Sequence, residues 1–374
     1  MKKKIVVIVV STLLTIGIFQ GQSFFNQWQL HQRVEEVFLD DQDYHYFYDK
    51  MNDHEKEIYQ RLYYVIHEHQ ESIDVKTCDI ELLTDILIKL SYDHPEFYYV
   101  NINEFEYSQQ QESLIFYPHY DYTQQEIEYY HQKIKENTEE LIYQINLVED
   151  QILQIQMIYE YIADHVHYQM THQTDQTLIG SLVQGNAVCA GYARAYQYLL
   201  NQIDIDCTYI VGKSTDNSLN QGVIEGYEGH AWVMIHLDDD YYYSDVTWAD
   251  VEEGELQHTC YGYMLMSSDE MEKCYIPEVE YEKTNRVKTN YFIENGTYME
   301  SYDKEVFSHA VALAQSQGKH VAEIMCANDE VYQQVKNQLN HGYLGYDVLY
   351  ENGCWNDQSR YSWNDYLRVI ELFF

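Results

Sequence analysis

Residues 181–250 carry a helical pattern followed by two strand-like runs, and this order leaves few folds open. The helix is expected to begin at Cys189, and the loop Gln184–Asn186 precedes it. One face of it carries small and apolar residues at helical spacing: Ala190, Ala193, Tyr196, Leu199 and Leu200. We expect an α+β fold with this helix and the two strands in its core.

The position of Cys189 at the start of this helix favours a reactive sulfur. Backbone N–H groups without intrahelical acceptors and the positive end of the helix dipole stabilise a thiolate relative to a thiol. The same N–H groups could hold an oxyanion. Cys189 is therefore a candidate nucleophile, and the alternative is a buried structural thiol.

The two strand-like runs that follow predict a β-hairpin. The first strand is expected over Ala231–Leu237 and the second over Tyr241–Trp248, with an acidic turn between them. If the two-residue turn is Asp238–Asp239, Leu237 pairs with Asp240 and the register of the whole hairpin follows.

This register predicts that two polar side chains share one face of the hairpin. His230 lies opposite Thr247 and Asp245 lies opposite Trp232, so that His230 and Asp245 are diagonal neighbours at roughly 7–8 Å between backbones. A slip of one residue would place them on opposite faces. Otherwise His230 is a core histidine and Asp245 a turn or strand-end cap.

Cys189, His230 and Asp245 together predict cysteine-dependent acyl chemistry at an amide bond. Asp245 would orient the imidazole, and His230 would take the thiol proton and return one to the leaving amine. Attack by the sulfur gives a thioester. Water would resolve it by hydrolysis, and an amine would resolve it by cross-linking.

Three sequence blocks, each around one reactive side chain, occur in this order: Cys189–Ala193, Gly229–Trp232 and Asp245–Trp248. Together they resemble the transglutaminase-like superfamily, in particular its exported bacterial members. The resemblance implies a papain-like Cys-His-Asp arrangement and catalytic roles for Cys189, His230 and Asp245 only. It extends from Tyr168 to Tyr263–Leu265, about a third of the chain. Val233 departs from it, since many relatives carry Asn there.

The chain is expected to comprise four parts. Residues 1–25 read as a signal peptide or N-terminal membrane anchor, and residues 26–139 as a helical N-terminal region. The transglutaminase-like catalytic core is expected over 140–275. A small α+β domain is expected over 288–374.

The N-terminus has the pattern of an export signal. Lys2–Lys4 precede a mostly apolar run, Ile5–Phe19, and no clear cleavage site follows. A cleaved signal and an uncleaved anchor both stay open. In either case the body of the protein is expected outside the cytoplasm, extracellular or at the cell surface.

The net charge of −40, from 62 acidic and 22 basic residues, argues against nucleic acid as a partner, because such a field repels phosphate backbones. Membrane contact is expected only through the N-terminal segment. The expected partner is a protein or peptide substrate, possibly a component of the cell envelope.

Seven cysteines in an apparently exported chain leave at least one unpaired, and the other six could form disulfides or stay as buried thiols. There is no C-x-x-C pair, and His165, His167 and His172 lack a completing ligand pattern. We therefore expect no metal and no cofactor.

Flanking segments predict further elements. Between residues 31 and 92 we expect helices, followed by a strand-like stretch after Pro95 and an extended segment at Leu114–Tyr117. Helices are then predicted from Thr123 to about Glu136 and from Asp150 to Asp164. In the C-terminal part of the chain we predict a helix over Phe307–Ala314 and three strands, at Tyr291–Phe292, Tyr298–Met299 and Val321–Met325.

Hydrolysis, as a peptidase or amidase, is the favoured reaction, because water is the abundant acceptor outside the membrane. Protein cross-linking by a transglutaminase is the alternative within the enzyme class. A catalytically inert surface-binding module is the alternative from another class.

Overall fold

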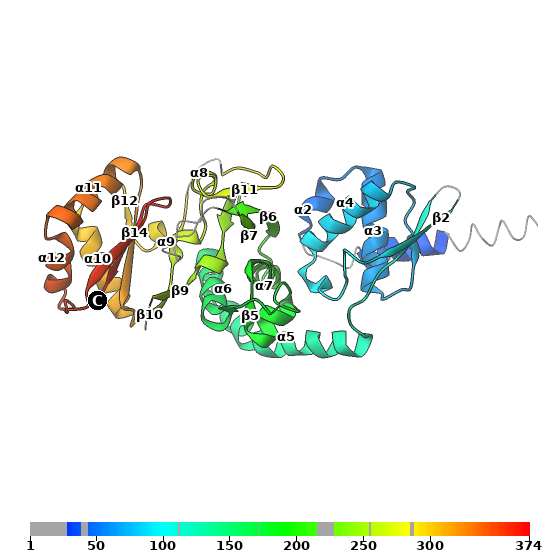
Figure 1. Ribbon diagram of the computed structural model, residues 1–374, viewed down its shortest axis with the longest axis horizontal. Helices are drawn as coiled ribbons and strands as arrows, with labels where there is room; N and C mark the ends of the chain where they lie inside the picture. The colour runs from blue at the N-terminus through cyan, green and yellow to red at the C-terminus, as the bar shows by residue number, and fades with distance from the viewer. Residues whose placement is uncertain are drawn as a thin grey trace, which may run out of the picture. The chain divides into compact units, whose positions relative to one another are not determined.

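The computed structural model describes residues 28–38, 44–110, 113–171, 173–214, 228–253, 256–284 and 288–374. The predicted signal peptide or anchor over residues 1–25 lies outside these ranges. Within them, no helix combines the length and the apolar character that crossing a membrane requires. The chain forms two compact units, Met1–Gln124 and Gln125–Phe374 (Figure 1).

The first unit packs helices beside a small antiparallel sheet of order β1-β3-β2. After a helix over residues 28–38, the helical elements are α2 (Tyr46–Asp49), α3 (Asp53–His67), α4 (Ile80–Asp93) and the 3-10 helix η1 (Pro95–Phe97). The strands are β1 (Ile73–Asp74), β2 (Glu106–Gln109) and β3 (Leu114–Tyr117). The predicted helices between residues 31 and 92 and the segment Leu114–Tyr117 are confirmed.

The strand predicted after Pro95 is wrong, because the chain continues there as a 3-10 turn. Asp93, the last residue of α4, is buried and accepts hydrogen bonds from the N–H groups of Phe47 and Tyr48, both at 3.2 Å, and from the hydroxyl of Tyr59 at 2.9 Å. These bonds join α4 to α2 and α3. Burial raises the pKa of Asp93 to about 6.

The second unit begins with α5 (Gln124–Ile145) and α6 (Gln151–His165). The predicted helix from Asp150 is confirmed, with Asp150 as its N-cap. The helix predicted from Thr123 begins where expected, but it continues past Glu136 to Ile145. Buried Ile134, Thr138 and Ile145 extend its packed face.

The next segments lead to Cys189. Strand β4 (His167–Tyr168) pairs in parallel with β5 (Asn186–Ala187), and a π-helical turn, η2 (Ile179–Gln184), lies between them. Gly185 ends this turn with a positive φ of 71°, a conformation that glycine adopts without steric cost. Helix α7 (Cys189–Asn201) then begins at Cys189, as predicted.

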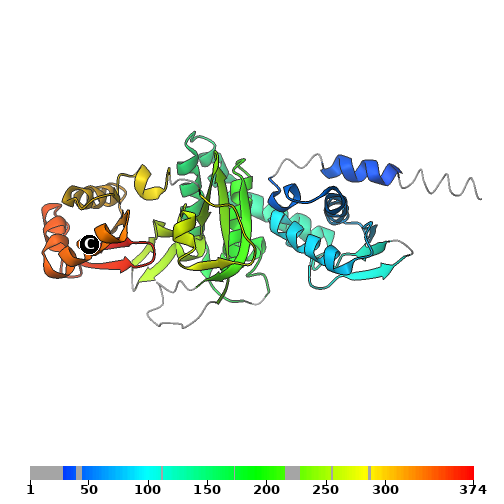
Figure 2. The ribbon, with the colours of Figure 1, turned by 90° about the horizontal axis from the view of Figure 1, so that it is seen from above.

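The central sheet has the order β11-β6-β7-β8, with every neighbouring pair antiparallel. Its strands lie side by side in Figure 2. They are β6 (Cys207–Ser214), β7 (Glu228–Leu237), β8 (Asp240–Ser244) and β11 (Tyr275–Pro277). Helix α7 packs against β6, β7 and α6.

The predicted hairpin register is confirmed, since Leu237 pairs with Asp240 and Val233 with Ser244. The second strand is shorter than predicted, because it ends at Ser244 and does not reach Trp248. The Asp245 carboxylate accepts the N–H of Thr247 at 3.1 Å and starts the 3-10 turn η3 (Val246–Trp248). Thr247 therefore does not pair with His230.

Beyond η3 the chain forms the hairpin β9 (Asp250–Glu253) and β10 (Leu256–Thr259), the turn η4 (Tyr261–Tyr263) and the short helix α8 (Ser268–Met271). A second four-stranded sheet then forms in the order β12-β13-β15-β14. Its strands are β12 (Tyr298–Met299), β13 (Val321–Cys326), β14 (Arg360–Asn364) and β15 (Val369–Phe373).

Helices cover this second sheet with a common apolar core that includes Val311, Ile324, Val335, Val348 and Ile370. They are α10 (Lys304–Ser316), α11 (Asp329–His341) and α12 (Leu344–Glu351), preceded by α9 (Tyr291–Glu294). The strands predicted at Tyr298–Met299 and Val321–Met325 and the helix over Phe307–Ala314 are confirmed.

The strand predicted at Tyr291–Phe292 is wrong, because these residues lie in α9. The side chain of Asn290 accepts the N–H of Ile293 at 2.8 Å and caps the helix there. Both sheets combine with helices, so the α+β class is confirmed. The boundaries expected at residues 139/140 and 275/288 stay predictions; the first of them lies inside α5.

Candidate active site

Cys189 is the first residue of α7 and is partly exposed. Two backbone bonds hold the start of this helix: Val188 donates its N–H to the carbonyl of Asp175 at 2.9 Å, and Gly191 donates to the carbonyl of Val188 at 2.9 Å. Val188, the N-cap, makes no side-chain cap hydrogen bond. The first N–H groups of a helix have no intrahelical acceptor, so this end offers donors to an anion beside the sulfur.

His230 and Asp245 come from neighbouring strands and meet directly. His230 lies on β7, and Asp245 follows the last residue of β8. The distance from His230 Nε2 to Asp245 Oδ2 is 2.6 Å. The histidine side chain is 8% exposed and the aspartate side chain is fully buried. A carboxylate this close, shielded from water, fixes the orientation of the ring.

The sulfur of Cys189 completes the arrangement, because it lies near enough to the His230 side chain to raise the pKa of the imidazole. Nε2 is bound to Asp245, which leaves Nδ1 as the ring nitrogen for the sulfur. Burial lowers the pKa of His230, but the Asp245 carboxylate and the Cys189 sulfur raise it more strongly, to about 10. The imidazole is therefore held as an imidazolium at neutral pH.

Tyr275 is a site residue that the sequence analysis missed. Its hydroxyl donates to Asp245 Oδ2 at 2.8 Å, so this oxygen accepts from both Tyr275 and His230. The other carboxylate oxygen accepts the N–H of Thr247. Tyr275 lies on β11, 30 residues beyond Asp245, and it is one of 40 tyrosines in the chain, so no local pattern marks it.

Aromatic rings surround the imidazole of His230. Ring centroids lie 5.7 Å away for Trp248, 6.0 Å for Tyr275 and 6.1 Å for Trp232. Trp232 is completely buried. These rings reduce the local dielectric constant, which strengthens the charge interactions between His230 and Asp245.

The other ionisable residues considered in the sequence lie elsewhere. His165 ends α6 with Nδ1 at 2.8 Å from the carbonyl of Tyr161, and exposed His167 lies on β4. His172 is outside the described residues. All seven cysteines are free thiols, so disulfides between the other six do not form here.

A family model for the transglutaminase-like superfamily matches residues 139–252. The chain carries a transglutaminase-like domain. The matched residues include Cys189, His230 and Asp245, and they contain α6, α7 and three strands of the central sheet. The predicted transglutaminase-like core is confirmed, and a domain of this kind supports cysteine-based catalysis in general.

Two solved structures are similar to parts of this chain. One is a TGase, with 13% identity and a TM-score of 0.26 over 38% of this chain and 44% of that chain. The other is a protein from Cytophaga hutchinsonii proposed to be a cysteine protease, with 14% identity and a TM-score of 0.26 over 38% of this chain and 61% of that one. The chain thus spans roughly half the length of these proteins. No curated protein matches it.

Proposed function

We propose that this protein hydrolyses amide bonds of proteins or peptides outside the cell membrane, with Cys189 as nucleophile, His230 as acid and base, and Asp245 as the group that orients His230. One observation carries the proposal: the Cys189 sulfur at the start of α7 lies beside an imidazole that Asp245 holds at 2.6 Å.

The first half of the reaction forms a thioester. The Cys189 thiolate attacks the amide carbon, and the new oxyanion accepts hydrogen bonds from N–H groups at the start of α7. When the tetrahedral intermediate collapses, the carbon–nitrogen bond breaks and the His230 imidazolium gives its proton to the leaving amine. The acyl group stays on the sulfur, and the imidazole is neutral.

The second half transfers the acyl group to water. Neutral His230 takes a proton from a water molecule while its oxygen attacks the thioester carbon. The carbon–sulfur bond then breaks, which releases the carboxylic acid and restores the thiolate–imidazolium pair. A primary amine in place of water would give a cross-linked product, so the choice of acceptor decides between hydrolysis and transamidation.

The location outside the membrane rests on the basic and apolar pattern of the first 25 residues. Water is there the most abundant acceptor, which favours hydrolysis. A protein or peptide of the cell envelope is the substrate class nearest to such an enzyme.

The test incubates the full chain with a casein-like substrate and a labelled primary amine. We expect new amino termini in the substrate and no incorporated label, and we expect the new amino termini to be absent for Cys189→Ala. Cys207→Ala, which changes a buried thiol of β6 outside the site, is the matched control and should retain activity.

Two results would contradict hydrolysis. Incorporation of the amine as the main product would identify a cross-linking enzyme. No product, together with an ordinary rate of Cys189 alkylation by iodoacetamide that His230→Ala leaves unchanged, would identify an inert binding module. Substrate trapping with Cys189→Ala on cell envelopes would then identify the natural substrate of an active enzyme.

A further inference from the structure

Two glutamates face each other in the C-terminal sheet. Glu323 on β13 pairs directly with Glu371 on β15. Glu323 is 7% exposed, and the Glu371 side chain is 16% exposed. Like charges directly opposite each other on two strands destabilise a sheet, and burial increases the cost. A bound cation would offset this repulsion.

A third donor comes from the transglutaminase-like core. Cys260 is buried and directly precedes η4. Its sulfur, one carboxylate oxygen of Glu323 and one carboxylate oxygen of Glu371 all lie within 4.8 Å of one another. Among the described residues this is the one group of three or more such donor atoms that lie so close together. The donors come from separate parts of the sequence and meet only in the folded chain.

His258, two residues before Cys260, borders the cluster but lies outside the group of three whose donor atoms are all within 4.8 Å of one another. Its Nε2 lies 3.1 Å from Glu371 Oε1, and its side chain is 10% exposed. In a tetrahedral site with bonds of about 2.0–2.3 Å, neighbouring donor atoms are about 3.4 Å apart. The His258–Glu371 separation is close to this value.

We propose that Cys260, Glu323 and Glu371 bind one divalent transition-metal ion, that a shift of the His258 side chain brings its imidazole in as the fourth ligand, and that Zn²⁺ is the ion that fits these donors best. A thiolate, an imidazole and carboxylates are the ligands that zinc takes in tetrahedral sites. Mg²⁺ and Ca²⁺ prefer oxygen donors alone, so the sulfur and the imidazole disfavour them.

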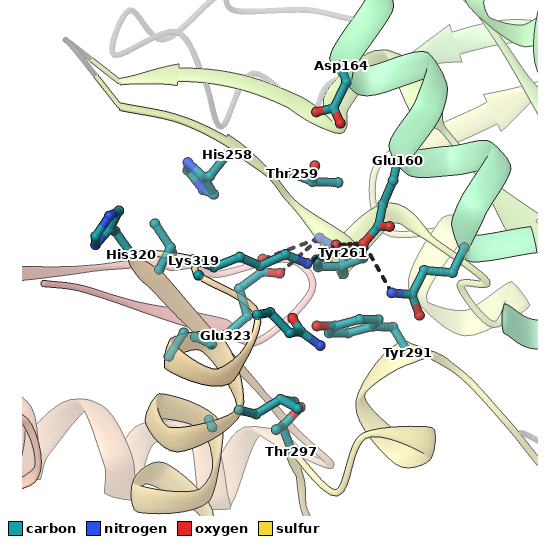
Figure 3. Close-up of a pocket in the computed structure, with 18 residues that line it drawn as sticks. Glu160, Asp164, His258, Thr259, Tyr261, Tyr291, Thr297, Lys319, His320 and Glu323 are labelled. Atoms are coloured by element: carbon teal, nitrogen blue, oxygen red, sulfur yellow. Dashed lines mark hydrogen bonds and ion pairs between the residues drawn. The ribbon is translucent and has the colours of Figure 1, made fainter. Parts of the chain in front are cut away.

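A cavity of about 590 Å³ gives an ion a route to the site. His258 and Glu323 line it, together with acidic residues Glu160 and Asp164 of α6 (Figure 3). Lys319 also lines the cavity, but its ammonium group lies 3.2 Å from Glu160, which neutralises part of its charge. The acidic walls attract cations toward His258 and Glu323.

The ion would connect the core to the C-terminal sheet. His258 lies on β10 and Cys260 follows it, whereas Glu323 and Glu371 lie on β13 and β15. Metal binding would therefore stabilise the folded second unit, and it is independent of the chemistry at Cys189.

The test measures zinc bound to the full chain after equilibration with ZnCl₂ and removal of excess ion. We expect about one Zn²⁺ per chain and a higher unfolding temperature with zinc present. Cys260→Ser and Glu323→Gln should each weaken zinc binding by at least about tenfold. Cys207→Ser, a buried thiol of the same unit outside the cluster, should bind zinc like the unchanged protein.

Cobalt substitution reports directly on the sulfur. Co²⁺ should give a thiolate-to-metal charge-transfer band that Cys260→Ser abolishes and Cys207→Ser retains. If Cys260→Ser fails to fold, Glu371→Gln, which changes a less buried ligand, replaces it in the zinc measurement. Zinc content near zero, or equal zinc binding by the unchanged protein and the folded ligand variants, would overturn the proposal.

Discussion

His230 is in contact with two groups that favour its protonated form. The Asp245 carboxylate and the Cys189 sulfur outweigh the effect of burial, and the pKa of His230 rises to about 10. The pKa of His230 is higher in the folded protein than its ordinary value of 6.5, so its protonation stabilises the folded state, and this stabilisation is complete below pH 6.5. This contribution is lost as the pH rises through about 10.

The pH profile of the enzyme should report this protonated histidine. We expect kcat/KM to persist above neutral pH and to fall only as the pH approaches about 10, because neutral His230 cannot protonate the leaving amine. Asp245→Asn removes the charge that raises the pKa, so the fall should move to lower pH and kcat/KM should decrease by at least about 100-fold. Steady-state rates against a peptide substrate measure both effects.

A basic limb near pH 6.5 in the unchanged protein would contradict this assignment, since His230 would then titrate as an ordinary histidine. Circular dichroism at each pH serves as the control, because it separates loss of activity from unfolding.

At the level of elements, the start of α7 must approach its neighbours closely to hold Cys189 in place. Gly191 lies in the first turn of the helix, and a Cβ atom there would lie 2.4 Å from the carbonyl oxygen of Asp175 and 2.8 Å from the Cβ of Ala187. The carbonyl of Asp175 also accepts the N–H of Val188, just before Cys189. The chain near Asp175 therefore determines where the nucleophile lies.

Gly191→Ala should therefore displace the first turn of α7. We expect the free energy of unfolding to fall by about 1–3 kcal/mol, because a backbone atom cannot give way as a flexible side chain can. Urea unfolding measures the change, and the rate of Cys189 alkylation should fall with it.

Gly229→Ala is the matched control for Gly191→Ala. It lies beside His230, and a Cβ atom there meets nothing within 4 Å. Equal stability of the two variants would contradict the packing argument.

At the scale of the whole molecule, charge opposes compactness. A net charge of −40 on 374 residues creates repulsion that a folded chain concentrates and an unfolded chain relieves. This property belongs to neither unit alone. The exclusion of nucleic acid as a partner, which the sequence analysis expects from this charge, stays a prediction.

Salt should therefore stabilise the protein. Between about 0.01 M and 0.15 M salt the screening length falls from about 30 Å to about 8 Å, so we expect the unfolding temperature to rise. Scanning calorimetry measures the unfolding temperature at each salt concentration, and a chelator removes divalent ions that could stabilise the protein by binding. Sodium and choline chloride should act alike if screening is the cause, and an unfolding temperature that falls with added salt would count against it.

Local patterns in the chain were enough for the start of α7 and for the register of the β7–β8 hairpin. Helix starts depend on a few neighbouring residues, and a two-residue turn sets every pair along a hairpin. His230 and Asp245 could therefore be placed on one face before any coordinates were known. The end of β8 at Ser244 was missed, because it depends on a side-chain bond from Asp245 to the next turn.

Contacts between distant segments could be found only in the folded chain. Tyr275 reaches Asp245 because β11 pairs with β6, two strands away from β8 in the central sheet. Cys260 meets Glu323 and Glu371 because a turn of the core packs on the second sheet. Such contacts have no period and no fixed spacing in the sequence, since packing of whole elements brings them together.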